Sequence, residues 1–310
     1  MLKNKWIKLG LKILVSLFFV WWIIFKINWE DVFFYLKKIS FWGIAIYIGI
    51  YFLGIFFSAY KWRFLATHKG INLPLKDYFK AYFTGTFINN FMPSFIGGDS
   101  YKVYNIGKLS QKYKQSASSV IMDRLTGLWG GMILAFIFSL CNLKDILENN
   151  ILFILSIINF GILIFSLGFL EFYKKREIKI PIDNLDKFFN KLLREVAYYN
   201  NDARVIWKAI GLSFLFNLTG LALANYIIFW SLGISVGVLD YLSVIFLVSI
   251  ISSIPISINN IGVKEWAYIT FFGFFGIASG AVISVAIVSR LIQMLLSFLA
   301  IGFYFDSRKT

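Results

Sequence analysis

The chain has 310 residues, of which 59% are hydrophobic and only 15% are charged, and its net charge is +15. Soluble domains are roughly 45–50% apolar and about 25% charged, so this composition excludes an ordinary soluble enzyme. One cysteine and one histidine exclude an internal disulfide and a zinc site built from pairs of these residues. We expect no cofactor.

The N-terminal region is a basic stretch followed by an apolar run from Leu9 to Phe25. A secretory signal peptide has this outline, but no small-residue cleavage site follows the run. Trp21, Trp22 and Trp29 instead suit a membrane interface. We therefore expect a first membrane helix that is retained in the mature protein.

Six segments are long and apolar enough to cross a bilayer. A spanning helix needs about 20 mostly apolar residues, because the hydrocarbon layer is roughly 30 Å thick. The six expected spans are 9–27, 41–60, 125–142, 151–170, 209–231 and 281–304. The predicted fold is an all-α integral membrane protein with about six transmembrane helices.

Two further apolar segments, 78–100 and 241–275, are interrupted by proline, glycine and paired asparagines. The interruptions are Asn89, Asn90, Pro93 and Gly97 in the first segment, and Pro255, Asn259, Asn260 and Gly262 in the second. Backbone freed by a proline at membrane depth must lie against protein or line a wet cavity. We therefore expect each segment to be a broken helical hairpin.

The distribution of basic residues predicts the orientation of the chain. Lysine and arginine concentrate in the loop expected to begin at Lys61, in the stretch after the first hairpin and in the linker 171–208. Cytoplasmic loops carry such an excess. This places both termini in the cytoplasm and the protein in the cell membrane as a multi-pass protein. Segment 78–100 then enters from the cytoplasm and returns, whereas segment 241–275 enters and returns from outside.

Two re-entrant hairpins of opposite sense are typical of inverted-topology transporters, in which broken helices meet near the membrane midplane. We interpret residues 1–310 as a single transmembrane domain with halves of about 1–142 and 151–310. The alternative is that the two segments are ordinary kinked helices or hairpins that serve only in packing.

Charged side chains within or beside the spans are the main functional candidates, because each costs about 2.5–3.5 kcal/mol on insertion scales. They are Asp99, Lys102, Asp123, Arg124, Lys264, Glu265 and Arg290. Arg290 lies near the middle of the last span, so a carboxylate partner is expected, with Glu265 or Asp99 as the suppliers. A structural ion pair is the alternative for Arg290, and interfacial anchoring is the alternative for Asp123 and Arg124.

Three segments resemble the signatures of one known family. They are NFMPSFIGGDSYK at 90–102, DRLTG at 123–127 and IPISINNIGVKE at 254–265. These segments are similar to the lysylphosphatidylglycerol synthase transmembrane region, a flippase-like group of bacterial and archaeal membrane proteins, and the similarity covers nearly the whole chain. Lys102 stands where the family more often has arginine.

The resemblance implies a domain that moves a lipid, or a lipid-linked headgroup, between leaflets. Composite members add a soluble aminoacyltransferase, but this chain ends directly after its last expected helix, so we do not expect transferase activity. The expected substrate path comprises Asn89, Asn90, Pro93, Gly97, Gly98, Asp99, Lys102, Asp123, Arg124, Pro255, Asn259, Asn260, Gly262, Lys264, Glu265 and Arg290.

We therefore predict a lipid translocator that is not an enzyme. The sequence has no Gly-rich phosphate loop ending in Lys-Ser/Thr, so ATP hydrolysis is not expected. The expected partners are membrane lipids with anionic or phosphate-bearing headgroups, not nucleic acid, with a second copy or an envelope-lipid enzyme as a further partner. One alternative is a membrane-embedded transferase acting on a polyprenyl-phosphate lipid, and another is a non-transporting partner of an envelope-lipid enzyme.

Overall fold

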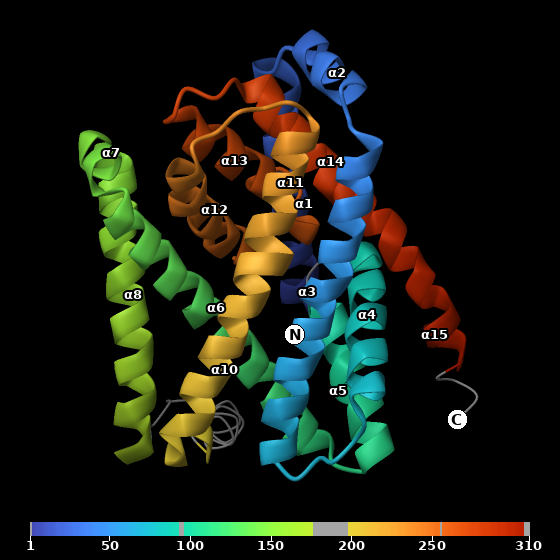
Figure 1. Cartoon of the computed structure of the whole chain (residues 1–310). Coiled ribbons are helices and arrows are strands. Elements are labelled where there is room, and N and C mark those ends of the chain that lie inside the picture. The colour runs from blue at the N-terminus through green and yellow to red at the C-terminus, as the bar shows by residue number, and fades with distance from the viewer. Residues whose placement is uncertain (1, 93–95, 176–197, 255, 307–310) are drawn as a thin grey trace.

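The structure is a computed structural model that describes residues 2–92, 96–175, 198–254 and 256–306. Within these ranges the regular elements are all helices, with no strand (Figure 1). Pro93, Pro255 and most of the basic linker 171–208 lie outside the described residues. The prediction of an all-α membrane protein is confirmed.

Five helical segments are long and apolar enough to cross a membrane. Three of them are α3 (Phe41–His68), α6 (Tyr113–Cys141) and the part of α8 (Asn150–Lys175) that covers Asn150–Phe169. The fourth, Ala203–Ser231, comprises α10 (Ala203–Phe216), the π-helical segment η2 (Asn217–Leu223) and α11 (Ala224–Ser231). The fifth, Ser279–Phe303, comprises α14 (Ser279–Ser297), η4 (Phe298–Ala300) and the start of α15 (Ile301–Asp306). A sixth span is counted when α1 (Leu2–Lys26) and α2 (Trp29–Lys37), which are bent by 84°, are taken as one. All six expected spans therefore have helical counterparts.

Two expected span boundaries are wrong. Helix α3 continues to His68, so Lys61 lies inside the helix and not in a basic loop. Helix α6 already begins at Tyr113, so Asp123 and Arg124 lie well within it and not at its cytoplasmic end. A span predicted from hydropathy ends at its first charged residue. The helix itself can continue past that residue when the charge is paired with an opposite charge in the fold.

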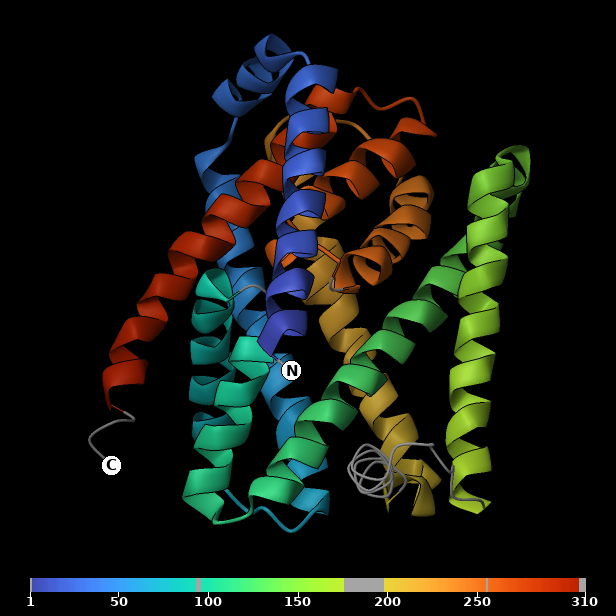
Figure 2. The same cartoon turned by 180° about the vertical axis from the view of Figure 1, so that it is seen from behind.

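Two pairs of shorter helices occupy opposite halves of the molecule. Helices α4 (Leu75–Phe91) and α5 (Ile96–Ser110) pack together in the lower half of Figure 1, whereas α12 (Val238–Ser253) and α13 (Val263–Gly273) pack in the upper half. The view from behind shows the same separation (Figure 2). Both apolar segments are thus broken, and their re-entrant course through a bilayer stays a prediction.

Glycines allow close approach of helix backbones at two of these contacts. A Cβ atom on Gly98 of α5 would overlap the carbonyl oxygen of Gly85 in α4. A Cβ atom on Gly54 of α3 would lie 2.7 Å from the Cα atom of Gly220 in η2. Small residues at helix crossings are typical of membrane bundles, where dispersion contacts replace the hydrophobic driving force.

Hydrogen bonds between side chains, and from side chain to backbone, join α6 to α8. Ser156 donates to Ser139 at 3.1 Å, and Asn159 donates to the carbonyl of Met132 at 3.0 Å. The indole of Trp129 donates to Ser166 at 3.0 Å. Polar side chains stabilise helix association in lipid in this way, by about 0.6–2 kcal/mol each.

The connections at the two ends of the bundle differ in charge. The α3–α4 and α5–α6 connections lie at the lower end of Figure 1 and carry Lys69 and Lys112, with Lys76 and Lys114 in the first turns of the helices that follow. The upper end carries α2 and the short helix α7 (Leu143–Glu148), each of which contains two acidic residues and one lysine. This asymmetry agrees with the expected orientation, and the cytoplasmic location of the termini stays a prediction.

Candidate functional site

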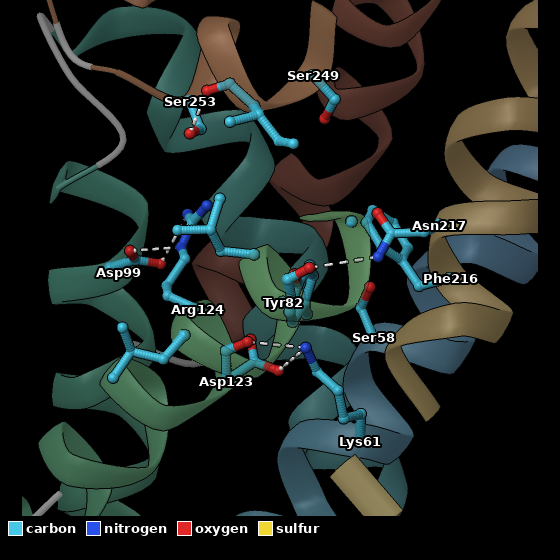
Figure 3. A pocket seen from close by; sticks show the side chains of 15 residues that line it. Ser58, Lys61, Tyr82, Asp99, Asp123, Arg124, Phe216, Asn217, Ser249 and Ser253 are labelled. Atoms are coloured by element: carbon cyan, nitrogen blue, oxygen red, sulfur yellow. Dashed lines mark hydrogen bonds and ion pairs between the residues drawn. The ribbon is translucent and has the colours of Figure 1, made fainter. Parts of the chain in front are cut away.

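A cavity of about 380 Å³ lies between the two short-helix pairs and the long helices around them (Figure 3). Tyr82 of α4 and Asp99 of α5 line one part of its wall. Ser249 and Ser253, in the last turns of α12, line another part. The two predicted hairpins, which are far apart in the sequence, therefore contribute to the same cavity.

The first ion pair of the cavity wall joins α3 to α6. Lys61 Nζ lies 3.0 Å from Asp123 Oδ1, and the two side chains are 5% and 2% exposed. Lys61 also donates to the backbone carbonyl of Asp123 at 2.7 Å and to Ser213 Oγ at 3.2 Å. A buried charge is tolerated only when it is paired and hydrogen-bonded, and Lys61 meets both conditions.

The second cluster is a carboxylate shared by two cations. Arg124 donates from Nε to Asp99 Oδ2 at 2.9 Å and from Nη2 to Asp99 Oδ1 at 3.0 Å, a bidentate contact. Lys102 Nζ lies 2.8 Å from the same Oδ1 atom. Because Asp99 is one turn before Lys102 on α5, both side chains project from the same helix face.

The two cations of this cluster differ in exposure. The Lys102 side chain is 4% exposed, and its ammonium lies 4.3 Å from the ring centre of Tyr82 and 5.5 Å from that of Trp62. The Arg124 side chain is 47% exposed and forms part of the cavity wall. Lys102 therefore supports Asp99 from the protein side, while Arg124 faces the cavity.

The asparagines and glycines of the first pair hold its two helices in place. Asn89 Oδ1 accepts a hydrogen bond from the backbone of Gly98 at 2.8 Å, and Asn90 donates to Ser297 of α14 at 2.5 Å. A Cβ atom on Gly97 would overlap the Met92 side chain. Both asparagines thus face protein, and neither is among the described residues of the cavity wall.

A separate cluster holds the connection between α12 and α13. Arg290 of α14 donates to Glu265 Oε1 at 2.7 and 3.0 Å, and to the carbonyls of Asn259 at 3.1 Å and Asn260 at 3.4 Å. Glu265 Oε2 accepts the backbone N–H of Gly262 at 2.7 Å. The guanidinium therefore joins the start of α13 to the turn that precedes it.

The backbone of that turn explains its residue types. Asn259, Asn260 and Gly262 have φ angles of 47°, 56° and 84°, a left-handed region that asparagine tolerates and glycine adopts at little cost. Asn260 also donates to the carbonyl of Ser252, at the end of α12. Lys264 donates to Ser289 at 3.4 Å. None of these residues is among the described residues of the cavity wall.

The structure thus divides the expected path residues between two places. It brings Asp99, Asp123 and Arg124 to the cavity and joins Arg290 to Glu265, but Asp99 is not among the described partners of Arg290. Pro93 and Pro255 lie outside the described residues. The assignment of all these positions to a substrate path stays a prediction.

Several residues of the cavity wall were not predicted from the sequence. They are Ser58, Lys61, Tyr82, Asn217, Ser249 and Ser253. A signal was nevertheless present, because Gly54, Ser58 and Lys61 repeat at helical spacing on α3. Such a stripe of small and polar residues in an otherwise apolar helix indicates a face turned away from lipid.

The helical fold and the buried charges define an integral membrane protein of the helical-bundle class. The model of the lysylphosphatidylglycerol synthase TM region family matches residues 10–301, so the chain belongs to this family. No curated protein and no solved structure matches the chain. Membership of the family relates this membrane protein to lipid handling.

Proposed function

We propose that the protein moves a phospholipid, or a lipid-linked headgroup, between membrane leaflets without hydrolysing ATP and without changing the lipid chemically. The observation that carries this proposal is the cavity between the two short-helix pairs, with the half-exposed Arg124 held beside Asp99 in its wall. Family membership, which relates the protein to lipid handling, supports it independently.

The physical requirement for such transport is a polar path for a charged headgroup, while the acyl chains remain in lipid. Arg124 has the planar donor geometry that binds a phosphate group bidentately. Asp123 pairs with Lys61 and Asp99 pairs with Arg124 when no lipid is bound, so neither carboxylate is left without a cation. Leu125, Leu128 and other apolar residues complete the wall.

The arrangement of the two short-helix pairs supports an inverted-repeat mechanism. One pair lies in each half of the bundle, and both contribute to the cavity wall (Figures 1 and 3). In our proposal both pairs are re-entrant, both termini are cytoplasmic, and rocking of one half against the other exposes the cavity to each leaflet in turn. Basic connections at the lower end of the bundle favour this orientation.

A liposome assay tests the proposed function. The purified protein is reconstituted with fluorescent phospholipids, and dithionite quenching measures how fast inner-leaflet lipid becomes accessible. We expect movement above the protein-free rate, and a loss of about tenfold or more in Arg124→Gln, because the variant lacks a charge-assisted bidentate contact. Arg204→Gln, which replaces an exposed arginine of α10, is the matched control.

Two results would contradict the proposal. One is that the protein moves neither anionic, zwitterionic nor polyprenyl-phosphate lipids faster than empty vesicles. The other is that folded Arg124→Gln, checked by size-exclusion chromatography, moves lipid at the parent rate. A covalently altered lipid in the same vesicles would instead support the transferase alternative.

A further inference from the structure

We infer that α2 is an interfacial helix: it lies in the plane of the membrane, and its exposed aromatic face binds phospholipids at the boundary between headgroups and acyl chains. The leaflet concerned is the one at the upper end of the bundle in Figure 1. This location of α2 does not depend on the proposed transport function. The direction of α2, its one packed face and its exposed side chains carry the inference.

The direction of α2 differs sharply from that of the helix before it. Helices α1 and α2 meet at an angle of 84°, whereas α1 and α3 both follow the long axis of the bundle (Figures 1 and 2). Asn28 begins α2, because its side-chain oxygen accepts the backbone N–H of Glu30 at 3.0 Å. Only residues 38–40 separate α2 from the membrane span α3. A helix that crosses the bundle axis and is tied so closely to a span stays at the membrane surface.

One face of α2 packs against the first turns of α14. Val32 is 1% exposed and shares a small apolar cluster with Ile283. Ser284 donates to the carbonyl of Val32 at 3.4 Å, and a Cβ atom on Gly280 would lie 2.7 Å from the Cβ atom of Asp31. These contacts fix which side of α2 faces the protein.

The rest of α2 exposes large aromatic side chains. Phe33 and Phe34 are 60% and 55% exposed, and Trp29, one turn before Phe33, is exposed as well. Phe41 and Trp42, in the first turn of α3, are also exposed. Exposed apolar residues that gather in this way mark a surface that binds a protein or a membrane.

The lysines beside these rings favour a lipid surface over a protein partner. Lys37 ends α2, Lys38 follows it directly, and both are exposed. The ammonium of Lys38 lies 3.9 Å from the ring centre of Phe34. Lysine is depleted from protein–protein interfaces. In interfacial helices, in contrast, lysine accompanies tryptophan and phenylalanine, because its stem lies along apolar surface while its ammonium reaches the headgroups.

The charges of α2 have a second role that the aromatic residues do not share. Glu30 and Asp31 lie in the first turn and Lys37 in the last, which is the distribution that stabilises a helix through its dipole. The exposed rings contribute nothing to this effect, and their contact with water would be unfavourable. The aromatic face is therefore the part of α2 that needs a partner, and the leaflet around the adjoining span α3 supplies it.

An interfacial α2 also fixes the depth of α14 at one end. Because α2 packs on the first turns of α14, phospholipids that hold α2 in the headgroup layer hold that end of α14 as well. The same helix carries Arg290, which joins it to the turn before α13.

Nitroxide labels on single cysteines test the location of α2. Cys141 is the only cysteine, so Cys141→Ser gives a background without cysteine. In this background Phe33→Cys is labelled, and the protein is reconstituted in phosphatidylcholine vesicles. Electron paramagnetic resonance then measures collisions of the label with oxygen, which concentrates in lipid, and with a nickel chelate, which stays in water. Ile158→Cys, exposed in the middle of the α8 span, and Arg204→Cys, exposed at the start of α10, are the lipid and water references.

We expect the ratio of oxygen to nickel collisions at position 33 to lie between the values at 158 and 204. A second experiment places the label at Lys37→Cys and changes Phe33. Phe33→Glu should release α2 from the interface and shift the ratio at 37 toward the value at 204, whereas Phe33→Trp should keep it. Only variants with a parent-like elution volume are compared.

Four results would overturn the inference. A ratio at 33 equal to that at 204 places α2 in water, and a ratio equal to that at 158 makes α2 part of a broken span. A label at 33 that is immobilised and shielded from both reagents shows that a second copy or another protein covers the face. A ratio at 37 that folded Phe33→Glu leaves unchanged removes the role of the aromatic face. None of these results alters the outcome of the liposome assay, so the proposed function is tested separately.

Discussion

Replacing Arg290 by glutamine tests whether its cluster holds the α12–α13 connection together. The change removes two contacts to Glu265, whose side chain is 9% exposed, and two hydrogen bonds to the carbonyls of Asn259 and Asn260. Loss of one partner of a buried ion pair costs roughly 3–5 kcal/mol. Arg290 is 27% exposed, so the pair is not fully buried, and we expect the lower end, about 3 kcal/mol.

Thermal unfolding of the purified protein in detergent, followed by tryptophan fluorescence, measures this loss. A loss of 1 kcal/mol lowers Tm by about 2–4 °C in chains of 150–250 residues and by less in longer ones, so for 310 residues we expect a fall of roughly 6 °C. Combining Arg290→Gln with Glu265→Gln leaves two neutral amides and should restore part of the loss. A parent-like Tm in Arg290→Gln would refute the reasoning. So would a double variant whose fall in Tm equals the sum of the falls in the two single variants. Exposed Arg204→Gln is the control.

Three further predictions follow from other contacts. Gly98→Ala places a methyl group against the backbone of α4 and should lower stability by about 1–3 kcal/mol in the same unfolding assay. At Gly161 the added methyl group has open space, so Gly161→Ala should leave stability unchanged or raise it by up to about 1 kcal/mol. Equal effects of the two substitutions on stability would contradict the packing argument. Lys61→Met leaves the buried Asp123 without its cation and should lower stability by roughly 3–5 kcal/mol. Adding Asp123→Asn should restore part of that stability, and a double variant whose loss equals the sum of the two single losses would contradict this pairing. Cys141, which is exposed at the end of α6, should react with an impermeant maleimide in intact cells, and labelling only after permeabilisation would reverse the orientation.

The spans were predictable because the bilayer imposes one strong constraint on the backbone. Each N–H and C=O group must be paired within the segment, so a long apolar run becomes a helix. The ends of the spans were less predictable. The segment that begins at Tyr113 is polar enough to suggest a loop, yet it is the first part of α6 and packs against α5.

The charge pairs were only partly predictable. Arg290 and Glu265 could be joined on the argument that a mid-span arginine needs a carboxylate. Asp123 and Arg124 are adjacent in the sequence, but neighbouring residues on a helix point about 100° apart. Asp123 therefore pairs with Lys61 of α3, while Arg124 pairs with Asp99 of α5.

The polar wall contributed by α10 and η2 shows what a sequence pattern leaves open. Ser213, Asn217 and Gly220 repeat at intervals of four and three residues, as expected for one face of a helix. The pattern indicates that this face avoids lipid, but it does not identify the neighbour. In the structure Ser213 accepts from Lys61, Asn217 donates to the carbonyl of Gly127, and Gly220 contacts α3.

The two arginine clusters place different demands on a transport cycle. Arg290 binds one carboxylate at the start of α13 and two backbone carbonyls of the turn before it. These contacts join the turn between α12 and α13 to α14. Asp99, in contrast, keeps Lys102 when Arg124 departs. In the proposed transport cycle, Arg124 is therefore the guanidinium that turns from its carboxylate to a headgroup, because Asp99 then still has a cation, whereas the Arg290 cluster holds the α12–α13 connection.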